Sequence, residues 1–251
     1  MLPAILLLFA ATSAAAELEI RVVYDNTSAG LAEDWGFAAL VTFQGRNVLF
    51  DSGTKPDLFL RNFDALKLDA KAIRHAVISH EHGDHRNGIY KLYPRNPAMR
   101  VHFLDNFPAP AFDEATAVAL QPARVRAPAE IVPGVFTTGI IEGNPPEQSL
   151  LIETSKGLVI LTGCSHPGIL KIVETAKRQR GAKSIRMLIG GFHMFRMPAG
   201  EIDAIVTGLR NLGVESIVPA HCTGDPAKQR FREVFGQNCS EAGAGKLIRL
   251  D

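Results

Sequence analysis

Hydrophobic and polar residues alternate in two segments near the start of the chain, with the two-residue period of a half-buried strand. These segments are residues 19–24 and 38–43. The polar run at residues 44–47 is typical of a turn, and residues 48–50 resume the hydrophobic pattern after it. We therefore expect residues 38–50 to form a hairpin.

Later segments alternate between helical and strand-like patterns. Residues 57–66, 168–180 and 202–212 repeat hydrophobic side chains every three or four positions, as a helix with one buried face does. Pro56 suits the first turn of the first helix, and Gly213 ends the third. Hydrophobic runs typical of buried strands lie at residues 75–79, 157–163, 185–192 and 214–219.

Residues 94–146 differ from the rest of the chain, because they contain nine of its fifteen prolines. Proline fixes the backbone and removes a hydrogen-bond donor, so it interrupts regular sheets and helices. The segment is either a long, semi-rigid connection or a lid at the rim of a functional site, where loops commonly carry specificity. Phe103, Phe107 and Phe112 would line such a rim or belong to the core.

Length and charge indicate one large domain without a strong electrostatic field, and the substrate that we expect is a small molecule. A chain of 251 residues buries a substantial core. Its net charge of +1 gives no strong field to attract nucleic acid or an anionic membrane. We therefore expect no nucleic-acid partner and no stable membrane anchor, and the oligomeric state stays open.

The first sixteen residues have the pattern of a secretory signal peptide. A hydrophobic run at residues 2–11 is followed by small residues up to Ala16, and Glu17 begins the polar chain. The run is too short to span a bilayer. It lacks the basic residue that usually precedes it, so a buried N-terminal segment is the alternative. We expect cleavage after Ala16, a mature domain of residues 17–251, and a periplasmic or secreted protein.

The strongest chemical pattern is the run from His80 to His85, which directly follows the strand at residues 75–79. Histidine and carboxylate side chains bind zinc, manganese or iron. Packing gives no reason to place so many of them in one turn, because their desolvation would be costly. They are too many for one tetrahedral ion with an open position, so we expect two ions. The candidate ligands are His80, His82, Asp84 and His85.

Three further histidines share the same local setting. His166, His193 and His221 each follow a hydrophobic, strand-like run, so they could converge on one edge of a sheet. The two remaining histidines, His75 and His102, have no evident role.

The chain contains three cysteines, at positions 164, 222 and 239. Cys164 has two interpretations. As a thiolate ligand it would be soft and would favour zinc, but free cysteine is also a common core residue. In an oxidising compartment Cys222 and Cys239 are candidates for a disulfide, which would leave one cysteine unpaired.

These motifs resemble the metallo-β-lactamase fold superfamily, whose HxHxDH signature corresponds to the run from His80 to His85. The resemblance extends from about Leu18 to Asp251. It implies an α/β fold, a four-layer αββα sandwich with helices outside two packed sheets. One branch, labelled 7,8-dihydropterin-6-yl-methyl-4-(β-D-ribofuranosyl)aminobenzene 5'-phosphate synthase, is similar also at Tyr24–Ser28, Trp35–Phe37, Phe50–Gly53, Thr162–Gly168, Gly190–His193 and His221–Gly224.

The resemblance also implies how the ligands divide between two ions. His80 and His82 would bind the first ion, and the second would be bound by Asp84, His85 and His221. Many relatives supply a further histidine to the first ion from a region that reads Pro145–Ser149 here, without a histidine. His166 is the substitute that this chain offers.

Three more roles follow from the resemblance. Cys164 stands where many relatives have an aspartate that bridges the two ions. His193 is either an inner ligand or an acid that faces the substrate. Asp51 resembles a structural aspartate that braces the ligand loop, and such support affects both affinity and activity.

Two ions roughly 3.5–4 Å apart lower the pKa of a water between them, and the hydroxide attacks a carbonyl or phosphoryl centre. The sequence therefore predicts an exported hydrolase of an ester, lactone, amide or phosphoester, with Asp84 and His193 as catalytic residues. A β-lactamase would be a special case, with Arg196 as the candidate for binding the carboxylate of the drug.

Two alternatives remain. The branch label favours a transferase that joins a pterin diphosphate to an aminobenzene ribotide, although that step is cytoplasmic and the signal peptide argues against it. Cys164 and the missing histidine leave open a non-hydrolytic di-metal redox or sulfur-oxidising protein.

Overall fold

The computed structural model describes residues 16–251 of the chain. The predicted signal peptide, residues 1–16, lies outside the described residues except for Ala16. Within the described part, every helix is too short or too polar to cross a membrane.

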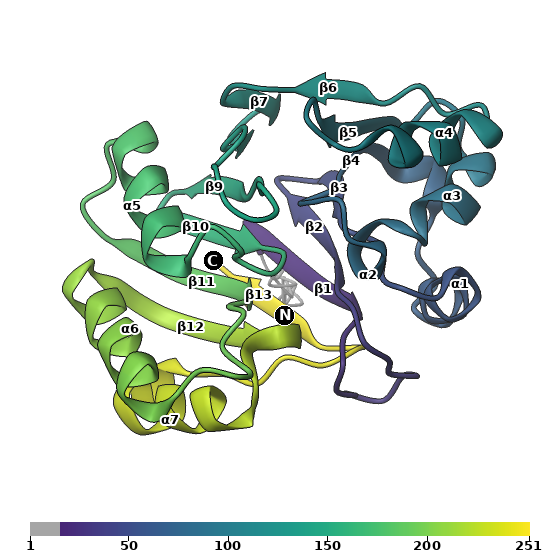
Figure 1. The fold of residues 1–251 in the computed structure, drawn as a ribbon. Helices are drawn as coiled ribbons and strands as arrows, with labels where there is room; N and C mark the ends of the chain where they lie inside the picture. The colour runs from purple at the N-terminus through teal and green to yellow at the C-terminus, as the bar shows by residue number, and fades with distance from the viewer. Residues whose placement is uncertain (1–15) are drawn as a thin grey trace, which may run out of the picture.

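Two β-sheets form the centre of the molecule (Figure 1). The seven-stranded sheet has the order β13-β1-β2-β3-β4-β5-β6. Its strands are β1 (Leu18–Tyr24), β2 (Ala38–Phe43), β3 (Arg46–Phe50), β4 (Ile73–Val77), β5 (Arg100–Leu104), β6 (Ala123–Val125) and β13 (Leu247–Leu250). The six-stranded sheet has the order β12-β11-β10-β9-β8-β7. Its strands are β7 (Ala129–Val132), β8 (Val135–Thr137), β9 (Leu150–Thr154), β10 (Gly157–Thr162), β11 (Ile185–Gly191) and β12 (Val214–Ala220).

Helices cover the outer face of each sheet (Figure 1). Those on the seven-stranded sheet are α1 (Pro56–Ala65), α3 (Ile89–Leu92) and α4 (Ala109–Ala117). Those on the six-stranded sheet are α5 (Ile169–Arg180), α6 (Ala199–Asn211) and α7 (Asp225–Phe235). The one-turn helix α2 (Gly83–Arg86) and the 3-10 turns Ala70–Ala72, Tyr93–Arg95, His221–Thr223 and Gly236–Asn238 complete the elements. The molecule is the four-layer αββα sandwich that the family resemblance implied.

Both faces of each sheet are buried, and strand β2 shows how. Ala39 and Val41 point into the hydrophobic core between the sheets. Their neighbours Ala38 and Leu40 point into the core beneath the helices. Successive side chains of a strand face opposite sides, so a strand between two cores is hydrophobic at nearly every position.

The predicted local elements are largely confirmed. Strand β2 matches residues 38–43, and β2 and β3 pair as a hairpin. The turn of this hairpin is shorter than the predicted residues 44–47, because only Gln44 and Gly45 separate the two strands. Both residues have the positive φ of a tight turn. Helix α6 begins at Ala199, three positions before the predicted start, because Pro198 precedes its first turn. The predicted strand at residues 75–79 ends at Val77.

The proline-rich segment, residues 94–146, contributes to both sheets rather than forming one long connection. It contains β5, α4 and β6, and then β7 and β8 of the other sheet. Prolines fit there because they stand at element boundaries: Pro108 precedes α4 and Pro110 lies in its first turn. Phe103 and Phe107 are buried in the core beneath the helices, so the interpretation that they line a rim is wrong.

Candidate metal centre

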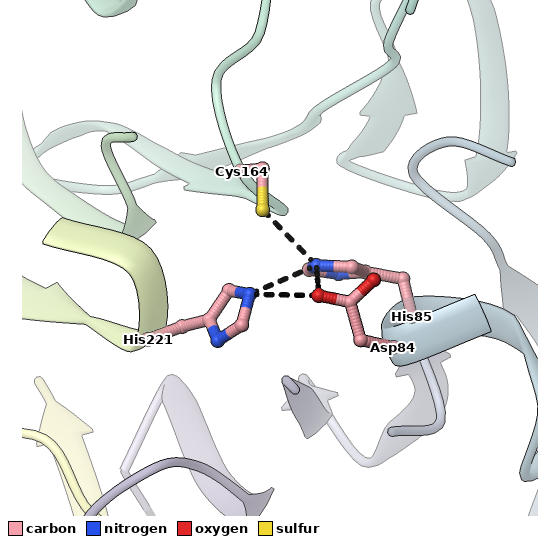
Figure 2. A group of neighbouring side chains, drawn as sticks. All are labelled: Asp84, His85, Cys164 and His221. Carbon is pink, nitrogen blue, oxygen red and sulfur yellow. Dashed lines mark hydrogen bonds and ion pairs between the residues drawn. The ribbon is translucent and has the colours of Figure 1, made fainter. Parts of the chain in front are cut away.

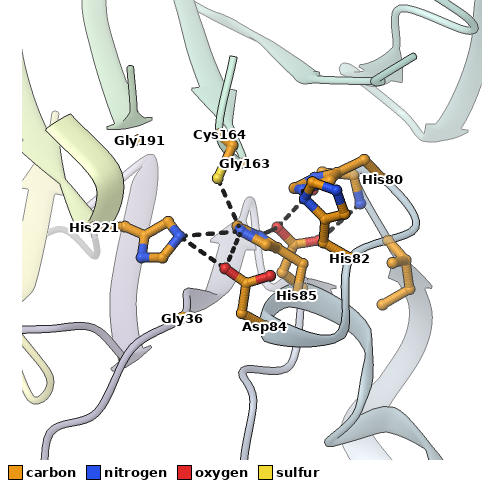
Figure 3. A network of polar contacts seen from close by, with 12 residues as sticks. Gly36, His80, His82, Asp84, His85, Gly163, Cys164, Gly191 and His221 are labelled. Atoms are coloured by element: carbon orange, nitrogen blue, oxygen red, sulfur yellow. Dashed lines mark hydrogen bonds and ion pairs between the residues drawn. The ribbon is translucent and has the colours of Figure 1, made fainter. Parts of the chain in front are cut away.

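The candidate ligands lie in loops that follow β4, β10, β11 and β12. Figure 3 shows how His80, His82, Asp84 and His85 lie near Cys164 and His221. Strands β3, β4 and β5 are parallel to one another, and so are β10, β11 and β12. Loops that follow the carboxyl ends of parallel strands meet at one edge of a sheet, where such folds bind ligands. The two sheets are packed face to face, so the loops of both converge on one place.

The first donor group consists of His80, His82 and His166, whose ligand nitrogens all lie within 4.8 Å of one another. The Nε2 atom of His80 lies 3.2 Å from Nδ1 of His82. The ring of His166 lies 4.8 Å from each of the other two rings. Its Nε2 atom is buried and has no hydrogen-bond partner among the described residues. Three nitrogens that converge on one point, one of them unsatisfied, fit the ligand set of a metal ion.

Electrostatics favours the neutral form of these imidazoles. Burial lowers the pKa of His80 well below its usual value, and nearby histidines lower it further. Burial also lowers the pKa of His166 to about 3. A metal ion binds only the neutral ring, so the protein holds these side chains in the form that a ligand needs.

The second donor group consists of Asp84, His85, Cys164 and His221 (Figure 2). The Nε2 atom of His85 lies 3.2 Å from Sγ of Cys164 and 3.2 Å from Nε2 of His221. The Oδ2 atom of Asp84 lies 3.3 Å from Nε2 of His221. Two imidazoles, a carboxylate and a thiol that face one another match a tetrahedral zinc site.

Asp51 and Ser79 set the orientation of the histidines from both groups. The Ser79 hydroxyl donates to Asp51 at 2.8 Å, so the hydroxyl accepts from Nδ1 of His80 at 2.9 Å. The Nδ1 atom of His85 donates to the same carboxylate at 2.7 Å. Burial lowers the pKa of His85, but Asp51, together with Asp84 and Glu147, raises it to about 9 in the absence of an ion. A bound ion would have to displace the proton from Nε2 of this ring. Protons held on Nδ1 leave Nε2 of both rings facing the donor groups.

Asn26 has the same role for His221. The sequence analysis included Asn26 in the motif Tyr24–Ser28 but gave it no role. The side-chain oxygen of Asn26 accepts from Nδ1 of His221 at 2.8 Å and from the backbone N–H of Gly36 at 3.1 Å. The neighbouring Asp25 accepts from the backbone N–H of His221 at 2.8 Å. Both lie at the end of β1, far from His221 in sequence, so only the fold shows that they support this ligand.

Glu147 is another residue to which the sequence analysis gave no role. Its buried carboxylate accepts four backbone N–H groups, from Gly163, Cys164, Ser165 and His166, at 2.9–3.0 Å. Burial raises the pKa of Glu147 to about 7 in spite of these donors. The carboxylate thus shapes the loop that presents Cys164 and His166. A single glutamate after two prolines forms no pattern, and no feature of the sequence indicates this role.

His193 lies beside both groups, in a third set with Cys164 and Cys222. Its ring is 4.3 Å from the ring of His166, and its buried Nδ1 has no hydrogen-bond partner among the described residues. The disulfide between Cys222 and Cys239, for which the sequence made both residues candidates, is not formed in this structure. Cys222 instead places its sulfur 3.2 Å from that of Cys164, and all three cysteines are free. The backbone of Cys239 pairs with Ile217 on strand β12.

Strained backbone conformations gather at the centre. Seven non-glycine residues among those that the structure describes have a positive φ, and four of them are Asp51, Ser165, His193 and His221. Such conformations cost energy and persist where surrounding structure enforces them. Each of the four stands just after the end of a strand, where the chain turns sharply to present its side chain.

The remaining candidates lie apart from the donor groups. His75 and His102 are on β4 and β5, and their rings contact each other with 3.0 Å between Nδ1 and Nε2. Arg196 is exposed, with its guanidinium 5.1 Å from the centre of the Phe195 ring.

Comparison with known proteins agrees with this geometry. The sequence model of the family described as the metallo-beta-lactamase superfamily matches residues 36–174. The 7,8-dihydropterin-6-methyl-4-(beta-D-ribofuranosyl)-aminobenzene-5'-phosphate synthase of Methanocaldococcus jannaschii is 27% identical, over 82% of this chain and 85% of the relative.

Solved structures show the same fold. The crystal structure of Tm1679, a metal-dependent hydrolase of the beta-lactamase superfamily, is 29% identical with a TM-score of 0.78, over 93% of this chain and 99% of that one. The short form of human tRNase Z, at 12% identity, shares the fold with a TM-score of 0.64, over 93% of this chain and 99% of that one.

Proposed function

This chain belongs to the metallo-beta-lactamase superfamily, and from that premise we propose that it is a binuclear metal-dependent hydrolase. Its substrate would be a small molecule with an ester, lactone, amide or phosphoester bond. One observation carries the proposal: two donor groups lie side by side, and a buried nitrogen, Nε2 of His166, has no partner among the described residues. Leaving such a nitrogen unsatisfied is costly, and a bound metal ion would remove that cost.

His80, His82 and His166 would hold the first ion, and Asp84, His85, Cys164 and His221 the second. When bound, the two ions would supply an activated water and a Lewis acid that polarises the bond under attack. Asp51 and Asn26 would keep the ring nitrogens of His85 and His221 directed at the ion.

His193 is positioned to deliver a proton to the leaving group. It is half-buried and adjoins both donor groups. A hydrogen bond to the sulfur of Cys222, whose own pKa is lowered, raises the pKa of His193 above the usual value, so the ring is more readily protonated. If residues 1–16 direct export, as the sequence predicts, the substrate would be met outside the cytoplasm.

Metal analysis combined with a hydrolysis screen tests the proposal. We expect about two ions per chain by inductively coupled plasma mass spectrometry, and turnover of a chromogenic phosphodiester, lactone or β-lactam. His82→Ala should lose both turnover and the ion of the first group. His75→Ala is the matched control, because His75 lies outside both groups, and it should keep both properties. A wild-type protein that binds no ion would refute the proposal, and bound iron without hydrolysis would favour redox chemistry.

The similarity to the Methanocaldococcus jannaschii synthase favours a transferase as the second candidate. The test offers the metal-loaded protein a dihydropterin diphosphate and an aminobenzene ribotide, and follows the joined product by mass spectrometry. Formation of that product, with no hydrolysis of any chromogenic substrate, would establish the transferase in place of the hydrolase. Hydrolysis without any joined product would exclude it.

A further inference from the structure

Two large hydrophobic side chains are exposed among the described residues, and they touch each other. Trp35 is 45% exposed and Phe195 is 36% exposed. Trp35 lies between β1 and β2, and Phe195 follows β11, yet their rings meet edge to face with centres 5.7 Å apart. A single exposed hydrophobic residue is ordinary, but two in contact beside a site indicate a binding surface.

This aromatic pair, Trp35 and Phe195, borders the candidate metal centre. The Trp35 ring centre lies 4.7 Å from the ring of His221, which belongs to the second donor group. The Phe195 ring centre lies 5.4 Å from the ring of His193, which adjoins the first. A substrate group held by the pair would therefore lie next to the reacting bond.

The backbone beneath both rings is held in place. The carbonyl of Trp35 accepts a hydrogen bond from Thr54, and a side chain at Gly36 would come within 2.6 Å of the Asp84 carbonyl. A side chain at Gly224 would come within 2.4 Å of the Cα atom of Phe195. Both glycines have a positive φ, so close approach and conformation together require them. Exposed rings on a fixed backbone lose little entropy on binding.

We propose that Trp35 and Phe195 bind a flat aromatic group of the substrate and make this centre selective for aryl-bearing substrates. The inference rests on the proposed function, because it concerns the substrate of the same site. Aromatic rings interact favourably edge to face or in offset stacks. The guanidinium of Arg196, 5.1 Å from the Phe195 ring centre, adds positive charge at this rim. That charge favours an aryl group that carries an anionic substituent.

A macromolecular partner fits this surface less well. A stable protein interface buries roughly 800 Å² on each partner. Two neighbouring side chains supply only a small part of that area, and the chain has no large net charge to attract nucleic acid.

The chain provides its own probe for the test, because Trp35 is its single tryptophan. Metal-loaded protein is titrated with phenylphosphonate and with cyclohexylphosphonate, which carry the same charge and differ mainly in aromaticity. Intrinsic fluorescence and calorimetry report binding without any turnover. We expect phenylphosphonate to bind roughly two- to tenfold more tightly and to change the emission of Trp35.

Two variants test whether the preference for phenylphosphonate depends on Phe195. Phe195→Leu should bind both phosphonates with similar affinity. Phe136→Leu is the matched control, because Phe136 also lies beneath an arginine, Arg180, but on strand β8 away from the donor groups. It should keep the aryl preference of the wild type.

Equal affinity for both compounds in the wild type, no binding of either, or an unchanged preference in Phe195→Leu would overturn the inference. These outcomes are independent of catalysis. Hydrolysis without an aryl preference would overturn this inference alone, whereas an aryl preference without hydrolysis of any substrate would overturn the proposed hydrolase and leave the aromatic site standing.

Discussion

Cys164 gives the second donor group its chemical character, because it adds a thiol to two imidazoles and a carboxylate. It is the soft member of the set, and soft ligands favour zinc over manganese. The side chain is buried, and burial raises the pKa of its thiol in the absence of an ion. A bound ion would have to displace that proton, so this site should bind metal more weakly as the pH falls.

Replacing Cys164 with aspartate should shift metal preference. Aspartate supplies a hard oxygen in place of sulfur, so Cys164→Asp should raise the ratio of bound manganese to bound zinc several-fold. The measurement is metal content after reconstitution in an equimolar mixture of both ions. Cys239→Asp introduces the same residue outside the donor groups and should leave the ratio unchanged. An unaltered ratio in Cys164→Asp would show that this residue is not a ligand.

At the scale of elements, the pairing of β4 with β5 brings His75 and His102 into contact at 3.0 Å. His102 is only 7% exposed. Burial, together with the nearby His75 and Arg100, lowers the pKa of His102 to about 4. The folded protein therefore resists protonation at this position more than the unfolded chain does.

This difference predicts that acid destabilises the fold through His102. As the pH falls from about 6.5 towards 4, His102 binds a proton in the unfolded chain but stays neutral in the folded state. The free energy of unfolding should decrease by about 3 kcal/mol over that range. Urea unfolding of the metal-free wild type and of His102→Gln, each at pH 8 and at pH 4.5, measures how much stability His102 costs at acid pH. A difference between the two proteins that does not change with pH would contradict it.

The loops that follow β4 and β10 meet at Gly163 and Ser79. A side chain at position 163 would come within 2.1 Å of the Ser79 hydroxyl, which holds His80 and Asp51 in place. The glycine is therefore required by the close approach of two elements from different sheets.

Gly163→Ala should separate these loops and cost about 1–3 kcal/mol of stability. It should also weaken metal binding, because the two sides of the centre move apart. Urea unfolding and chelator competition measure the two effects. Gly200→Ala is the control, because Gly200 has open space around it in the first turn of α6, and it should be neutral or slightly stabilising. Equal behaviour of both variants would show that the contact is unimportant.

At the scale of the whole molecule, the donors come from both halves of the sandwich. The loop after β4 in the seven-stranded sheet provides His80, His82, Asp84 and His85, and the six-stranded sheet provides Cys164, His166 and His221. Bound ions would therefore link the two sheets at the edge where their loops meet.

Removing metal should lower the melting temperature of the whole domain. An ion present at a thousand times its dissociation constant stabilises a protein by about 4 kcal/mol. For a domain of this size that corresponds to roughly 10 °C. Calorimetry with and without a chelator gives the shift, and His82→Ala should show a smaller one. An unchanged melting temperature, with metal loss verified by elemental analysis, would contradict a link between the sheets.

The sequence by itself determined the local elements and the main candidate ligands. The hairpin of β2 and β3 and the helices α1 and α5 follow from the spacing of hydrophobic residues within a few turns of chain. The run from His80 to His85 can be recognised as a candidate metal-binding motif because its members are adjacent in the chain. Such features depend on residues that are close together in the chain, so they can be read from the sequence directly.

Only the tertiary structure decided which distant residues meet. The proline-rich segment forms β5 and β6 of one sheet and β7 and β8 of the other. It can do so because its prolines fall at the boundaries of these elements. Glu147 binds the loop of Cys164, Cys222 faces Cys164 rather than Cys239, and Trp35 meets Phe195. Each of these contacts joins residues from separate elements, and none produces a periodic pattern. The packing of two sheets against each other places them together, and that packing is a property of the whole chain rather than of any segment.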